Sequence, residues 1–122
     1  MKIGLTDCEE IVMNTIWLME SKGEKHITLP MILLEVNLQH KKEWKPPTVS
    51  AFFARLVQKG VLDMRREGRL FCYRSIQSKE DYITSLFTKY TEFLFDGDVR
   101  IFKEAVQKWI SKEDVDLCKP EQ

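Results

Sequence analysis

Basic side chains gather in one stretch of the sequence, between Lys41 and Arg74. This stretch holds nine basic and three acidic residues, so its net charge is +6, whereas the whole chain has 19 of each and no net charge. The rest of the chain therefore carries −6. Guanidinium and ammonium groups bind phosphate oxygens, and a DNA duplex presents them in regular rows. The segregated charge favours a protein surface that binds nucleic acid, although a solvated surface whose charges happen to cluster would give the same net charge.

A helix expected at about 47–59 has small side chains opposite its apolar stripe, which holds Val49, Phe52, Phe53, Leu56 and Val57. Small residues let a helix approach base edges, where hydroxyls hydrogen-bond and alanine methyls contact thymine methyls. Hydroxyls near a helix start also serve as ordinary capping groups, and alanine is a good helix former, so both explanations stay open. The candidate DNA-binding residues of the helix and its approach are Lys45, Pro47, Thr48, Ser50, Ala51 and Arg55.

Two short runs flank Glu67-Gly68 and predict a β-hairpin at about 62–74. Leu62 and Met64 in the first run, and Leu70 and Cys72 in the second, recur at period two and predict an apolar side. Arginines at the tip of a hairpin suit phosphate or minor-groove contacts. The candidates are Arg65, Arg66 and Arg69.

Two helices are expected before these elements. Thr6 and Glu9 have the spacing of a capping box, and the helix they begin ends near Gly23. Residues 24–28 predict an extended connection, and Thr28 is expected to cap a second helix whose apolar side holds Met31, Leu34, Val36 and Leu38. Three helices followed by a hairpin predict a mainly α winged helix-turn-helix domain with a small β-hairpin, covering residues 1–77.

Residues 78–122 predict a helical arm that forms a homodimer. Two helices, from Ser78 and from about Val99, carry apolar stripes too large to stay exposed on a soluble monomer. A Ser111-x-x-Asp114 spacing predicts a short last helix. Folding back of the arm onto the domain would also hide the stripes. The candidate dimerisation residues are Ile83, Leu86, Phe87, Tyr90, Leu94, Phe102, Val106 and Trp109.

Catalytic and metal-binding motifs are not evident. His26 and His40 are the only histidines and have no suggestive cysteine or serine partner, and the sequence has no Gly-rich phosphate loop and no H-E-x-x-H. The long spacings of Cys8, Cys72 and Cys118 predict reduced thiols rather than disulfides or a closed zinc site. We therefore expect no enzymatic activity, cofactor or metal. Without an apolar run suited to a signal peptide or membrane span, the expected location is the cytoplasm.

Three motifs carry a resemblance to a known family. They are Thr6-Asp7-x-Glu9-x-x-Val12-Met13-x-x-Ile16-Trp17, then Trp44-x-Pro46-x-Thr48-Val49 with Arg55-Leu56-Val57-x-Lys59-Gly60, and Glu67-Gly68-Arg69-x-Phe71-x-Tyr73. Together they resemble the penicillinase and methicillin-resistance repressors and their copper-responsive relatives, closely over residues 5 to about 77 and loosely over 78–110. The resemblance implies a homodimeric transcriptional repressor of a palindromic operator. It assigns Thr48, Ser50, Ala51 and Arg55 to the recognition helix and Arg69 to the wing.

Several residues depart from the family pattern. Lys45 stands where the family usually has a serine cap, and Ala51 where threonine is common. The Asn-Phe bond that is cleaved in antibiotic-responsive members is absent, with Ala105-Val106 near the corresponding place, and the copper-responsive C-x-C pairs are absent too. The sequence thus identifies no inducing signal, sensor or protease. A winged-helix protein-interaction module that does not bind DNA is the alternative, and the zero net charge favours it.

Overall fold

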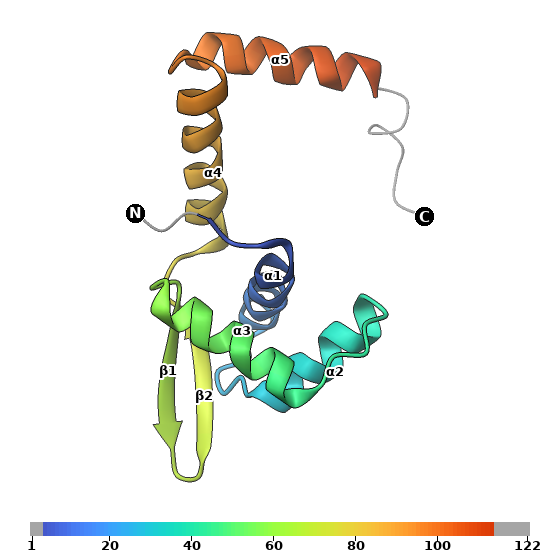
Figure 1. Cartoon of the computed structure of the whole chain (residues 1–122), viewed down its shortest axis with the longest axis vertical. Helices are drawn as coiled ribbons and strands as arrows, with labels where there is room; N and C mark the ends of the chain where they lie inside the picture. The colour runs from blue at the N-terminus through green and yellow to red at the C-terminus, as the bar shows by residue number, and fades with distance from the viewer. Residues whose placement is uncertain (1–3, 114–122) are drawn as a thin grey trace. The chain divides into compact units, whose positions relative to one another are not determined.

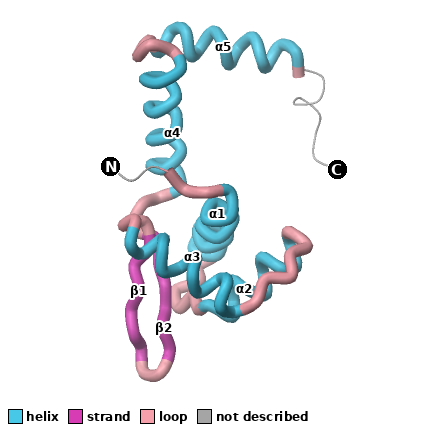
Figure 2. Tube along the Cα trace, in the orientation of Figure 1, coloured by secondary structure: helices cyan, strands magenta, loops and turns pink. Residues whose placement is uncertain are grey.

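A computed structural model describes residues 4–113, and within them the chain forms five α-helices and one two-stranded antiparallel sheet (Figures 1 and 2). The elements are α1 (Asp7–Ser21), α2 (Leu29–Gln39), α3 (Pro46–Gln58), β1 (Leu62–Glu67), β2 (Leu70–Ser75), α4 (Lys79–Leu94) and α5 (Val99–Lys112). The chain divides into two compact units, an N-terminal unit to Tyr82 and a C-terminal unit from Ile83. Three helices and a hairpin confirm the winged-helix prediction. Ser111 lies inside α5, so the prediction that it caps a separate last helix was wrong, because α5 continues through it to Lys112. Asp114 and Cys118 lie outside the described residues.

Helix α1 begins at the predicted capping box. The Glu9 backbone N–H donates to Thr6 Oγ1 at 3.2 Å, and the Thr6 N–H donates to Glu9 Oε1 at 2.9 Å. Both arms satisfy backbone donors that the first turn of a helix leaves free. Val12 and Met13, and Ile16 one turn later, are fully buried and place α1 in the core of the N-terminal unit.

The prediction for the apolar side of α2 was partly wrong. Ile32 and Val36 are fully buried, whereas Leu34 and Leu38 are 63% and 65% exposed. Apolar residues occur almost all round this helix, so the sequence pattern did not select one side. Packing against α1 and α3 selected it instead. Thr28 is the N-cap residue as predicted, but its side chain makes no capping hydrogen bond.

Helix α3 begins with Pro46 and Pro47, where a helix does not need their missing N–H groups. Of the predicted stripe, Val49, Phe53 and Leu56 are buried, Phe52 is half-buried and Val57 is exposed. The Phe53 ring lies 4.2 Å from the ring of Tyr73 on β2, measured between centroids. This contact fixes α3 against the hairpin.

The hairpin turns at Gly68, whose φ of 68° is in the left-handed region that glycine tolerates. Its inner end is held to the domain, since Leu62 and Cys72 are buried and Tyr73 N–H donates to Ile27 O at 2.8 Å. Ile27 thus adds a bridge to β2 from the extended connection at 24–28. Met64 and Leu70 are exposed, so the predicted apolar side was wrong there. The outer hairpin extends beyond the core that would cover them.

The C-terminal unit contains α4 from Ile83 onward and the whole of α5. A turn at Asp96 and Gly97, both with positive φ, separates the helices, and Asp98 caps α5 by accepting from Arg100 N–H at 2.9 Å. The ring of Phe102 packs against the rings of Phe87 and Phe95, with centroid separations of 5.6 and 5.3 Å. In the part of the chain that the structure describes, no helix is long and apolar enough to cross a membrane.

Candidate nucleic-acid interface

Helix α3 presents the predicted small side chains on its exposed side. Pro47, Thr48, Ser50, Ala51 and Ala54 are all exposed, opposite the buried stripe described above. The N-cap residue Lys45 is also exposed and makes no side-chain capping bond, so its ammonium group is available at the helix start. The helix therefore combines a close-fitting surface with positive charge and with the positive end of its dipole.

The side chain of Arg55 has a fixed position beside this surface. Its Nε donates to Glu9 Oε2 at 3.1 Å, and its guanidinium carbon lies 4.9 Å from the centre of the Phe52 ring. Half of the side chain is still exposed. The residue proposed for DNA contact is therefore also part of the internal structure, which the sequence did not indicate.

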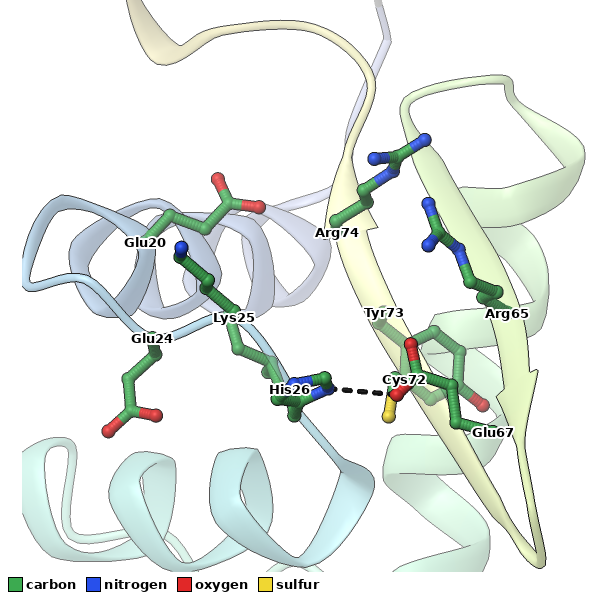
Figure 3. Close-up of a pocket in the computed structure, with 10 residues that line it drawn as sticks. Glu20, Glu24, Lys25, His26, Arg65, Glu67, Cys72, Tyr73 and Arg74 are labelled. Atoms are coloured by element: carbon green, nitrogen blue, oxygen red, sulfur yellow. Dashed lines mark ion pairs between the residues drawn. The ribbon is translucent and has the colours of Figure 1, made fainter.

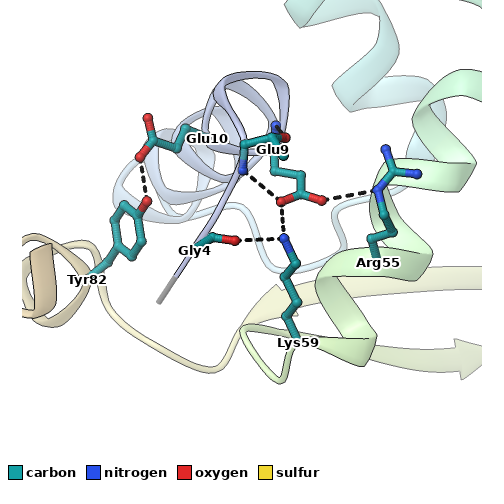
Figure 4. A network of polar contacts seen from close by, with 7 residues as sticks. Gly4, Glu9, Glu10, Arg55, Lys59 and Tyr82 are labelled. Atoms are coloured by element: carbon teal, nitrogen blue, oxygen red, sulfur yellow. Dashed lines mark hydrogen bonds and ion pairs between the residues drawn. The ribbon is translucent and has the colours of Figure 1, made fainter. Parts of the chain in front are cut away.

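Glu9 is the centre of this polar network, which Figure 4 shows. Its side chain is completely buried, and besides Thr6 and Arg55 it binds Lys59, whose Nζ lies 2.5 Å from Oε1. Lys59 Nζ also donates to Gly4 O at 2.8 Å. Glu9 thus fixes the C-terminal part of α3 to the start of α1. The capping-box pattern identified Glu9 only as a local cap, because its other partners are 46 and 50 residues away.

The pKa of Glu9 lies below its ordinary value of 4.5. Burial alone would raise the pKa, but the hydrogen bonds from Lys59, Thr6 and Arg55 and the charge of Lys59 outweigh it. Glu9 is therefore ionised at neutral pH. Because it lies outside the stretch 41–74 and pairs with two of its nine cations, the net charge of +6 overstates the positive surface by one.

The wing carries the other predicted contacts. Arg65, Arg66 and Arg69 are all exposed. Arg66 Nε donates to Gly68 O at 3.1 Å, and its guanidinium carbon lies 5.5 Å from the Phe71 ring centre, so this side chain is held at the turn. Arg74, at the inner end, forms an ion pair with Asp63 at 3.4 Å. The hairpin thus presents Arg66 and Arg69 beside its turn and Arg65 at mid-strand, opposite Cys72.

The predicted dimerisation residues all lie in the C-terminal unit, and none is buried within the chain. Leu86, Phe102 and Val106 are half-buried, and the exposed ones are Ile83, Phe87, Tyr90, Leu94 and Trp109. Phe93, Ile101 and Ile110 add to the same exposed apolar surface.

The family model and the similar proteins of known name point to the same family. The family model described as "Penicillinase repressor" matches residues 5–119. The methicillin resistance regulatory protein MecI of Staphylococcus aureus is 26% identical over 111 residues, which cover 91% of this chain and 82% of that protein. The penicillinase repressor of Bacillus licheniformis is 32% identical over 79 residues, 65% of this chain and 56% of the relative.

Two solved structures are similar in fold. The solution structure of the Bacillus licheniformis BlaI monomeric form in complex with the blaP half-operator has a TM-score of 0.51 and 30% identity, and the match covers 65% of this chain and 88% of that one. The complex structure of hsRosR-S1 has a TM-score of 0.54 over 93% of this chain and 95% of that one. At 17% identity, the second likeness concerns the fold alone.

Proposed function

Since the chain belongs to the penicillinase repressor family, we propose that it is a transcriptional repressor that binds a palindromic DNA operator as a homodimer. In this proposal, α3 enters the major groove and the hairpin tip contacts the backbone or minor groove beside it. The observation that carries the proposal is the exposed surface of α3, where small side chains and Lys45 lie together. A protein-interaction module would not need this combination.

The wing supports the same proposal. The hairpin carries three exposed arginines, two of them beside its tight turn, and packs against α3 through Phe53 and Tyr73. Arginine at such a position binds phosphates or enters a narrow minor groove. The relative BlaI was solved in complex with a half-operator, which is consistent with one DNA-binding domain for each half-site.

The homodimer is supported by the exposed apolar surface of the C-terminal unit. Seventeen large apolar side chains of the described residues are exposed, and nine of them belong to this unit. A two-fold symmetric interface would cover the same surface on both copies. It would also present two recognition helices to two half-sites about 34 Å apart, or a multiple of that distance.

A salt titration of duplex binding tests the function. If each half of the dimer neutralises about three to four phosphates, log affinity should fall against log salt with a slope of about −5 to −7. Fragments selected from random duplexes by the protein would supply the operator sequence. Binding that does not depend on salt, or no binding to selected duplexes at low salt, would refute the proposal.

A double variant tests the surface. Arg65→Ala with Arg69→Ala should reduce affinity for all duplexes, and the salt slope should become shallower by about one for each phosphate that is no longer bound. Lys103→Ala with Lys108→Ala removes two exposed cations from α5 and is the matched control. Equal reductions in affinity for both variants would show that the wing is not the DNA surface. Arg55→Ala is less informative, because it also breaks the ion pair with Glu9.

A further inference from the structure

Three potential metal ligands from distant parts of the sequence meet on the hairpin. They are His26, from the connection between α1 and α2, Glu67 at the end of β1, and Cys72 on β2. One ligand atom from each lies within 4.8 Å of the other two. Figure 3 shows the His26 imidazole directed at the Glu67 carboxylate, with the Cys72 sulfur beside it. His26 Nδ1 lies 2.9 Å from Glu67 Oε1.

The backbone places these side chains on the same face of the hairpin. Cys72 pairs with Arg65, and Leu70 with Glu67, and paired residues of antiparallel strands project to one face. His26 immediately precedes Ile27, whose hydrogen bond with Tyr73 fixes the connection beside β2. Tyr73 projects to the opposite face and packs on Phe53 of α3. The cluster is therefore positioned by three backbone segments on the face away from α3.

We propose that His26, Glu67 and Cys72 bind a zinc ion. Imidazole nitrogen, thiolate sulfur and carboxylate oxygen are the donors that zinc takes in proteins, and three protein ligands leave a fourth position for water. Zinc bonds of about 2.0–2.3 Å in a tetrahedron require donors about 3.3–3.6 Å apart. The ligand atoms lie within 4.8 Å of one another, so the widest separation has to shorten by about an ångström, whereas His26 Nδ1 and Glu67 Oε1, at 2.9 Å, have to move slightly apart. His26 and Glu67 can move, because their side chains are 69% and 38% exposed.

The surroundings suit a divalent ion. The three residues line a cleft of about 420 Å³, which gives an ion a path from solvent. Besides the ligands, the lining holds Glu20 and Glu24 together with Lys25, Arg65 and Arg74. Arg74 pairs with Asp63, which lies outside the lining, and Glu20 accepts from Ser75, so two carboxylates and two other cations remain in balance around the ion. On binding, the Cys72 thiol loses its proton to solvent, and the thiolate and the Glu67 carboxylate together neutralise the two charges of the ion.

The sequence predicted no metal site because no two of these ligands have motif spacing. His26 and Cys72 belong to different elements, and a turn separates Glu67 from Cys72. Cys72 forms no disulfide and lines the cleft, so its thiol is available to an ion that enters there, although the side chain is only 6% exposed.

Cobalt(II) titration of the full-length, reduced, chelator-treated protein tests the site. Cobalt takes the same ligands as zinc and absorbs light, so one equivalent per chain should produce a thiolate-to-cobalt charge-transfer band that one equivalent of zinc abolishes. Cys72→Ser should remove the band. His26→Ala and Glu67→Gln should each weaken cobalt and zinc binding at least about tenfold. Substituting a residue that merely hydrogen-bonds to a metal ligand already lowers metal affinity by about tenfold or more, and these two substitutions remove a ligand itself.

The chain supplies matched controls in Cys8→Ser, Cys118→Ser and His40→Ala, which should bind cobalt as the unchanged protein does. No thiolate band in the unchanged protein would overturn the proposal, as would loss of the band in Cys8→Ser or Cys118→Ser. If Cys72→Ser does not fold, the two histidine variants still decide, because both side chains are exposed and neither belongs to the core. Equal affinity of His26→Ala and His40→Ala would then refute the site.

Discussion

The two units of this protein bury their apolar side chains to very different extents. The N-terminal unit has a core in which Val12, Met13, Ile16, Ile32, Val36, Val49, Phe53, Leu56 and Leu62 are at most 1% exposed. Among the described residues from Ile83 onward, Thr91 alone is buried. Both units are rich in large apolar residues. Composition therefore does not decide burial, because a core needs elements that converge from several directions, and two consecutive helices supply too few.

The difference also has a functional side. The N-terminal unit holds its recognition surface by a core and by the buried Glu9 network, so α3 is preorganised. The C-terminal unit leaves its apolar surface for a partner, which we propose to be a second copy. In the proposed homodimer, pairing of the C-terminal units would join two winged-helix domains, and the affinity for DNA would then depend on binding two half-sites at once.

The largest effect expected from this comparison is on stability. Phe53→Ala should lower the free energy of unfolding by about 3–5 kcal/mol, because it opens a cavity at a fully buried site and removes the packing on Tyr73. Chemical denaturation at low protein concentration measures it. Phe93→Ala makes the same change in the other unit, at a side chain that is 74% exposed, and should cost less than about 0.5 kcal/mol. Similar costs for both variants would contradict the difference between the units.

The next effect is on self-association. Trp109→Asp should weaken the dimer by about 100-fold or more, since an unpaired carboxylate would be buried in the interface. Sedimentation equilibrium should find the unchanged chain dimeric at about 100 μM, where an interface of standard size is saturated.

Gln107→Asp adds the same charge to another exposed position of α5, one that is not apolar, and is the control. It should dimerise normally. A monomeric unchanged chain would show that the exposed apolar surface of the C-terminal unit is not a dimer interface.

The smallest effect concerns the Glu9 network. Glu9→Gln should cost about 1–3 kcal/mol at neutral pH, because it removes the charged hydrogen bonds to Lys59 and Arg55. The folded-state pKa of Glu9 is lowered, so its contribution is complete above the unfolded value near 4.5 and is lost as pH falls through the folded value. The difference in stability between the two proteins should therefore shrink as the pH falls below about 4.5 and through the lower folded-state pKa.

Denaturant unfolding at several pH values checks this, with Glu104→Gln, an exposed carboxylate of α5, as the control that should match the unchanged protein at neutral pH. A stability difference at Glu9 that does not change with pH would show that its charge is not what links α1 to α3.

Much of the fold was predictable from short patterns. The capping box of α1, the prolines of α3 and the glycine of the hairpin are each set by neighbours within four residues, and the structure bears them out. The exposed surface of α3 followed from the same periodicity. The apolar side of α2 and the exposure of Met64 and Leu70 were not predictable, because an apolar residue has no preference among several possible neighbours until the packing supplies one.

The sequence by itself determined the order of the elements, their caps and turns, and the concentration of basic residues in residues 41–74, because these depend on local backbone chemistry and on composition. Only the tertiary structure decided which partners meet across long separations. It joined Glu9 to Arg55 and Lys59, and it brought His26 to Glu67 and Cys72. It also left the C-terminal unit, as far as residue 113, without an apolar core. Hydrogen bonds and metal ligation act over a few ångströms. The number of residues between two side chains along the sequence does not determine whether the fold brings them that close.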